Sequence, residues 1–176
     1  YNEALSIIHK IIARDENMVS DLVGSRNPFG FSSSFRGKES GQAVIFSSKG
    51  RGYVQLNEIT QGKNIIKDYK VMISKVTSEH AGEPDKNGMF SVLSTIQILE
   101  PNEICTDSYL IAFHSNSKEE AINFRDYMCT KFFRFLLLQA VSSINLSKDK
   151  FCFIPQQNFS LSWDDDKLYK KYALNK

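Results

Sequence analysis

The chain has 176 residues, of which 41% are hydrophobic and 24% are charged, and its formal net charge is +2. This composition is typical of one globular domain, with or without a small appendage, and it excludes a disordered chain. No run of about 18 apolar residues and no signal-peptide pattern is present, so we expect no membrane partner.

The N-terminal residues 2–15 predict a helix, because Leu5, Ile8, Ile11 and Ile12 recur at helical spacing. We interpret residues 1–24 as a helical linker or appendage and residues 25–176 as the main domain. Since the chain starts at Tyr1 rather than at Met, we expect a fragment whose parent continues upstream.

The middle of the chain alternates between turn-forming segments and short strand-like runs. Residues 24–41 are rich in Ser and Gly and predict an irregular loop, and residues 78–87 predict an exposed loop. Gly50 and Gly52 flank Arg51 and predict a tight basic tip between two strands. The predicted strands cover residues 43–46, 53–56, 68–76, 91–99 and 109–113.

The C-terminal third contains the strongest helix pattern, over residues 117–141, followed by a short strand at 151–154 and a helix at 163–172. The acids at 164–166 fit the solvated N-terminus of that last helix. This element order favours an α+β fold with a mixed, mostly antiparallel sheet, a long buried helix and a short C-terminal helix.

Catalytic and metal-binding patterns are weak. Cys105, Cys129 and Cys152 lie too far apart for a structural zinc site, and their odd number suits a reducing cytoplasm, so we predict a cytoplasmic chain without a metal or cofactor of its own. Residues 27–30 lack the second proline of an adenine-methyltransferase loop. The triplet 68–70 fits half of a Mg²⁺-dependent nuclease motif, with Glu58 as the best partner carboxylate.

The basic residues are concentrated in one part of the sequence. Between Gly24 and Lys75 nine Lys and Arg face three acids, a local balance of +6, which leaves −4 for the rest. A basic segment on an acidic body is the electrostatic footprint of a polyanion binder, although cations scattered over a solvated face give the same count.

The tail from Phe151 to Leu174 contains Trp163-Asp-Asp-Asp-Lys-Leu-Tyr-Lys-Lys-Tyr172 after a Pro-Gln-Gln-Asn-Phe run. It resembles the end of a family of bacterial type II restriction-modification proteins, fused N6-adenine methyltransferases or endonucleases with a C-terminal specificity region. Ala173 and Asn158 stand where Gly and Asp are usual. Further similar pieces are Arg26-Asn-Pro-Phe-Gly-Phe31, Tyr69-Lys-Val-Met-Ile-Ser-Lys75, Ser117-Lys-Glu-Glu-Ala121, Tyr127 and Lys131-Phe-Phe-Arg-Phe135.

More loosely, the layout is similar to the target-recognition domains of type I specificity subunits. The resemblance implies a domain that reads a short sequence in double-stranded DNA and holds the duplex for a catalytic domain of the same parent chain. S-adenosylmethionine, Mg²⁺ or both are implied for that parent and not for this fragment. The DNA sequence read, and whether the parent methylates or cleaves, stay open.

Candidate DNA contacts follow from the charge count and the loops, because cations bind phosphates and Arg, Asn and Lys reach base edges. They are Arg26, Asn27, Arg36, Lys38, Lys49, Arg51, Tyr53, Lys70, Ser74 and Lys75. Arg51, between two glycines, is the first candidate for insertion into a groove. Two alternatives remain: a Mg²⁺-dependent endonuclease domain that uses Asp68 and Lys70, and a protein-interaction module.

Overall fold

The computed structural model describes residues 2–78, 83, 86 and 91–175, and this part of the chain has an α+β fold. Four α-helices are α1 (Asn2–Ile12), α2 (Lys118–Met128), α3 (Lys131–Ala140) and α4 (Asp165–Tyr172). The strands are β1 (Ala43–Ser47), β2 (Gly50–Val54), β3 (Tyr69–Ser74), β4 (Ile96–Leu99), β5 (Glu103–Cys105) and β6 (Tyr109–Ser115). Short 3-10 helices lie at Val19–Asp21, Leu56–Glu58, Lys63–Ile65 and Lys148–Phe151.

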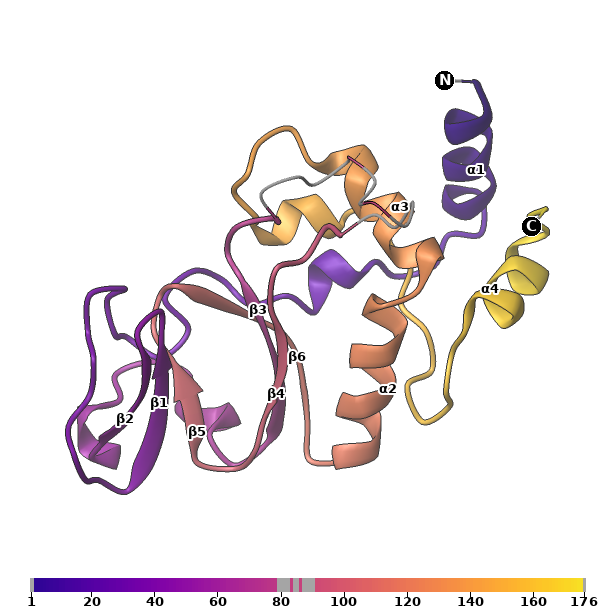
Figure 1. Cartoon of the computed structure of the whole chain (residues 1–176). Helices are drawn as coiled ribbons and strands as arrows, with labels where there is room; N and C mark the ends of the chain where they lie inside the picture. The colour runs from indigo at the N-terminus through magenta and orange to yellow at the C-terminus, as the bar shows by residue number, and fades with distance from the viewer. Residues whose placement is uncertain (1, 79–82, 84–85, 87–90, 176) are drawn as a thin grey trace.

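The strands form two small sheets. Figure 1 shows the first sheet, with the β1–β2 hairpin, at one end of the molecule and the second sheet between it and the helices. In the first sheet, of order β2-β1-β5, the β1–β2 pair is antiparallel and the β1–β5 pair is parallel. In the second, of order β4-β3-β6, both pairs are antiparallel. The sheets are therefore mixed and mostly antiparallel, as the sequence predicts.

Two apolar cores hold these layers together, one on each face of the second sheet. Ile45 and Ile104 of the first sheet pack with Met72 and Ile111, which project from one face of the second. On the other face, alternate residues such as Ile73 pack against α2 and α3. Because both faces are covered, the alternation along β3 does not separate a core side from a solvent side.

The helical segment at 117–141 is two helices rather than the single long helix that the sequence predicts. The second helix starts after Thr130, because the Thr130 hydroxyl accepts a hydrogen bond from Phe133 N (3.1 Å) and so caps the N-terminus of α3. The Asp165 carboxylate, from the start of α4, accepts from Lys131 N (3.0 Å) and Phe132 N (2.9 Å). These acceptors satisfy amides that would otherwise be unpaired at a new helix start.

The predicted strand at 151–154 is also wrong. The 3-10 helix Lys148–Phe151 occupies its first part, and a single bridge joins Pro155 to Met18. Val19 N donates to Ile154 O (2.7 Å), which fixes the N-terminal segment on the C-terminal one. The strand β5 was not predicted, and most of the predicted loop at 78–87 lies outside the described residues.

The N-terminal segment shares its core with the rest of the chain. Ile11, Val19 and Val23 are 0%, 0% and 3% exposed and pack in the same cluster as Phe124 and Tyr127. The helices α1 and α4 lie near each other (Figure 1), and Lys10 Nζ donates to Ala173 O (3.2 Å) between them. The boundary at residue 24 stays a prediction.

Candidate nucleic-acid interface

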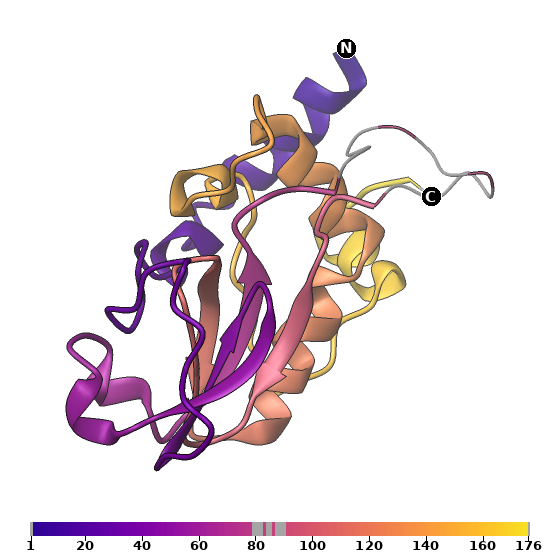
Figure 2. The ribbon, with the colours of Figure 1, turned by 60° about the vertical axis from the view of Figure 1, so that its left-hand side comes forward.

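The β1–β2 hairpin and the segment before it bring five of the predicted contact residues together. Lys38 and Tyr53 exchange both backbone hydrogen bonds, Lys38 N to Tyr53 O (2.8 Å) and Tyr53 N to Lys38 O (3.0 Å). Figure 2 shows this earlier segment running beside the hairpin. Arg36 and Lys38 thereby lie next to the strand that bears Arg51 and Tyr53.

Two glycines permit this close approach. A Cβ on Gly52 would lie 2.3 Å from Arg36 O, and a Cβ on Gly37 would lie 2.8 Å from Tyr53 N. Gly37 also has a φ of +82°, which L side chains rarely adopt. Glycine is therefore needed at both positions so that the two backbone segments can pack together. The sequence indicated only Gly52, beside Arg51, and indicated it as part of a turn.

Arg51 is held at the tip by Tyr53. Its Nη2 donates to Tyr53 Oη (3.1 Å), and its guanidinium carbon lies 5.8 Å from the centre of the Tyr53 ring. Gly50, the residue before it, has a φ of +116° and open space around a notional Cβ. Lys49 and Arg51 are both exposed, and neither has an acidic partner among the described residues.

The neighbouring cations are more strongly engaged. Arg36 Nη1 donates to the carbonyls of Ser33 (2.7 Å) and Phe35 (3.1 Å). Its guanidinium has no carboxylate partner in the described chain. Lys38 Nζ forms an ion pair with Glu58 Oε1 (2.7 Å). The hydrogen bond from Lys38 lowers the pKa of Glu58, so this acid stays ionised and neutralises Lys38.

A second group of predicted residues meets around Asp107. Asn27 N donates to Asp107 Oδ1 (2.7 Å), and Lys75 Nζ pairs with Asp107 Oδ2 (3.0 Å). The Lys75 side chain is only 15% exposed, and the neighbouring Ser74 hydroxyl accepts from Val76 N (3.3 Å). Ser74 and Lys75 therefore stabilise the chain at the end of β3, and little of the Lys75 side chain is exposed to a ligand.

Asn27 is placed as an anchor of its loop. Its φ of +55° is left-handed, and its Oδ1 is buried without a hydrogen-bond partner in the described part of the chain. A bidentate contact with adenine needs both the oxygen and the nitrogen of the amide. The buried oxygen rules out that contact in this conformation, while Arg26, the preceding residue, is exposed.

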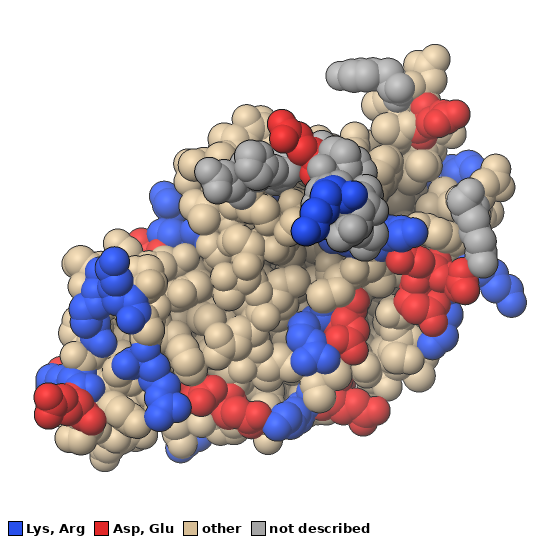
Figure 3. Space-filling view, viewed as in Figure 1, with Lys and Arg blue, Asp and Glu red and all other residues tan. Residues whose placement is uncertain are grey.

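Backbone contacts connect the Asp107 group to the hairpin. Thr106 N donates to Phe46 O (2.9 Å), and Phe46 is the cross-strand partner of Arg51. The Tyr109 hydroxyl donates to the backbone carbonyl of Ser47 (3.4 Å), the residue after Phe46. Arg26, Lys49 and Arg51 thus come from adjoining loops, and Figure 3 shows blue Lys and Arg side chains over the β1–β2 end of the molecule.

Lys70 is wrong as a DNA contact. Its side chain is 0% exposed, and Nζ donates to the carbonyls of Asp68 (2.6 Å), Ile66 (3.1 Å) and Ile65 (3.3 Å), with Glu100 O at 3.5 Å. Burial lowers the pKa of Lys70 to about 8. Lys70 projects from the face of β3 that the first sheet covers, so its side chain does not reach the surface.

The residues of the nuclease alternative do not form a metal-binding group. Asp68 Oδ2 contacts His114 Nδ1 (2.8 Å), Glu58 pairs with Lys38, and the Lys70 ammonium is enclosed by carbonyls. Within residues 2–78, 83, 86 and 91–175, no cluster of three or more His, Cys, Asp or Glu is placed to hold a metal ion. The described chain contains no helix long and apolar enough to cross a membrane.

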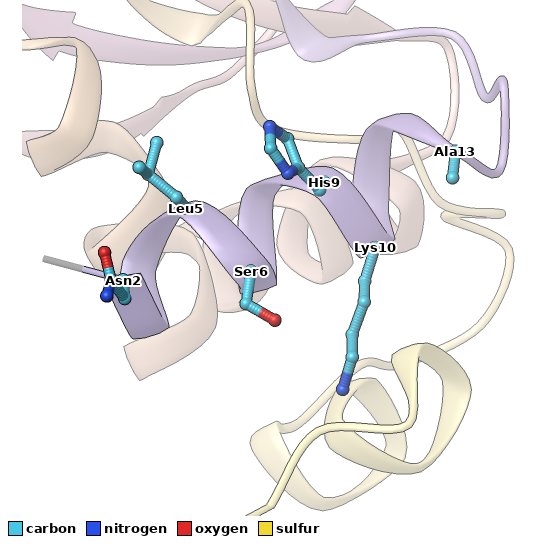
Figure 4. A pocket seen from close by; sticks show the side chains of 6 residues that line it. All are labelled: Asn2, Leu5, Ser6, His9, Lys10 and Ala13. Carbon is cyan, nitrogen blue, oxygen red and sulfur yellow. The ribbon is translucent and has the colours of Figure 1, made fainter.

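A shallow hollow lies on α1, away from the hairpin. Figure 4 shows its lining, in which His9 and Lys10 project from the helix between Leu5 and Ala13. Lys10 Nζ donates to Ala173 O (3.2 Å) and so ties α1 to the end of α4. The hollow is open to solvent and has no cluster of acids or nucleophiles, so it offers no chemistry.

Asp107, Gly37 and Gly52 organise this surface, and of these three residues the sequence singled out only Gly52. No pattern marks Asp107, because its partners Asn27 and Lys75 are 80 and 32 positions away.

Comparison with protein families, with curated proteins and with solved structures finds no match to the chain.

Proposed function

We propose that this chain is a sequence-specific DNA-binding module, the target-recognition domain of a bacterial restriction-modification enzyme. In this function it holds double-stranded DNA for a methyltransferase or endonuclease domain of the same parent chain. S-adenosylmethionine or Mg²⁺ would serve that catalytic domain. The DNA-binding part of the proposal has support from the surface, and the parent enzyme is inferred from the resemblance of the tail.

The observation that supports DNA binding is the gathering of exposed cations from separate loops at the β1–β2 end. Arg26, Lys49 and Arg51 have no acidic partner among the described residues, whereas Lys38 and Lys75 are neutralised by acids. A cluster of unneutralised cations concentrates positive potential, which attracts the phosphates of DNA.

The test is the affinity of the 176-residue chain for duplex DNA, measured by fluorescence anisotropy at several salt concentrations. A variant with Arg26→Ala, Lys49→Ala and Arg51→Ala should bind at least tenfold more weakly than the unmodified chain. The slope of log K against log salt should become shallower by about 0.9 for each of these side chains that contacts a phosphate, because its counterion is no longer released.

The matched control carries the same loss of charge at the helical end, with Lys131→Ala, Lys148→Ala and Lys170→Ala, all exposed in the structure. This control should retain the affinity and the salt slope of the unmodified chain. Absence of binding, or equal loss in both triple variants, would contradict the proposal and favour the protein-interaction alternative. DNA cleavage by the chain with Mg²⁺, abolished by Asp68→Ala, would favour the nuclease.

A further inference from the structure

We infer that Arg51 reads a guanine in the major groove and that Tyr53 holds its guanidinium in position for this contact. The inference rests on the proposed function, since it specifies how the same surface recognises DNA. It follows from the geometry of the hairpin tip, from the donors that Arg51 leaves free and from the shape of the two grooves.

The outward face of the hairpin forms a platform for Arg51. The cross-strand pairs are Phe46 with Arg51 and Val44 with Tyr53, so these four side chains share one face of the β1–β2 ribbon. The Phe46 and Tyr53 side chains are half-buried, whereas Arg51 is exposed. The hydrogen bond to Tyr53 restricts the Arg51 side chain before binding, which lowers the entropic cost of a contact.

Tyr53 fixes the guanidinium itself. Nη2 donates to Tyr53 Oη (3.1 Å), and the guanidinium carbon lies 5.8 Å from the ring centre. No hydrogen bond engages Nη1 or Nε of Arg51 within the described chain. Because the guanidinium has five N–H donors in a planar fork, this single bond leaves a pair of parallel donors available.

A pair of parallel donors matches guanine in particular. In the major groove guanine presents O6 and N7 as adjacent acceptors, whereas adenine presents one acceptor and one donor. In the minor groove A·T and T·A present the same acceptors, so a pair of donors there could not identify one base. A side chain held in one orientation can discriminate between these edges, while a lysine ammonium such as that of Lys49 acts as a point charge.

The size of the tip points to the same groove. Only the tip is two strands wide, because β5 pairs with β1 as far as Phe46. Neighbouring strands lie about 4.8 Å apart, so this tip with its side chains fits a groove about 12 Å wide and not one about 6 Å wide. Beyond Phe46 and Arg51, only Ser47 to Gly50 continue the hairpin, and residues 48–51 are exposed. Gly50 adds no side chain at the point of closest approach.

The experiment selects preferred sequences from a randomised duplex library with the unmodified chain, Arg51→Ala, Lys49→Ala and Tyr53→Phe. The unmodified chain should select a guanine at one position, and Arg51→Ala should lose that preference with about a 5- to 150-fold lower affinity for the selected site. Lys49→Ala should weaken binding without changing the preference. Tyr53→Phe should reduce discrimination between guanine and adenine at that position while binding to unrelated DNA stays constant.

A modified base locates the contact. Replacing the selected guanine by 7-deazaguanine removes N7, and this should weaken binding of the unmodified chain but not weaken Arg51→Ala further. If Arg51→Ala binds more weakly yet keeps every base preference, Arg51 is a phosphate contact, and the inference fails while the proposed function stands. If the unmodified chain binds no DNA, the proposed function and this inference both fail.

Discussion

At the scale of single residues, Lys70 gives a test of the packing between the two sheets. Burial lowers its pKa to about 8 in the folded chain, from an ordinary value of 10.5. Between these two pH values the unfolded chain binds the proton and the folded chain does not. The free energy of unfolding should therefore rise with pH, by about 2 kcal/mol between pH 7 and pH 9.5.

Chemical denaturation of the unmodified chain and of Lys70→Met at both pH values measures this contribution. Tyrosine and cysteine ionisation affects both proteins, so the difference between their pH dependences isolates Lys70. The methionine variant should lack the rise that Lys70 causes. An identical pH dependence in the two proteins would mean that Lys70 has an ordinary pKa and is accessible to water.

At the scale of elements, the interruption between α2 and α3 depends on a cap from a distant part of the chain. Asp165→Ala removes both acceptors from Lys131 N and Phe132 N, and it leaves the cap of α4 by Asp164 intact. We expect thermal or urea denaturation to show a loss of about 1–2 kcal/mol. Asp165→Asn, which keeps one acceptor oxygen, should lose less, and equal losses would contradict this role.

The end of α4 provides a prediction of the opposite sign. Ala173 caps this helix with φ +51° and ψ +47°, a left-handed conformation that glycine adopts without strain. Ala173→Gly should raise the free energy of unfolding by about 0.5–1 kcal/mol, the strain relieved less the added freedom of glycine when unfolded. Ala140→Gly, at the end of α3, is the control and should be destabilising; a loss of stability in both would refute the strain.

These elements also show which parts of the structure local sequence could reveal. The cap of α4 by Asp164 and the stripe of α1 are local, so the sequence predicts both helices to within a few residues. The start of α3 needs Asp165, and the burial of Lys70 needs a second sheet on the outer face of β3. At the site, the tip with Arg51 was predictable from its glycines, but the neutralisation of Lys38 and Lys75 by acids distant in sequence was not.

At the scale of the whole molecule, the N-terminal segment should be required for folding. Removing residues 1–24 deletes Ile11, Val19 and Val23 from the core, at about 1.5–3 kcal/mol for each buried side chain. It also removes Glu16, whose carboxylate accepts from Tyr172 Oη (2.6 Å) and pairs with Lys171 (2.6 Å). The sum is comparable with the total stability of an ordinary domain, about 5–15 kcal/mol.

Thermal unfolding followed by circular dichroism distinguishes a structural segment from an appendage. The chain shortened to residues 25–176 should lack a cooperative transition, because the core around Phe124 would be open on the side that Val19 and Val23 cover. Leu5→Ala with Ile12→Ala is the control, since these side chains are 46% and 47% exposed and should contribute little. A shortened chain that melts cooperatively within a few degrees of the full chain would show that residues 1–24 are an appendage.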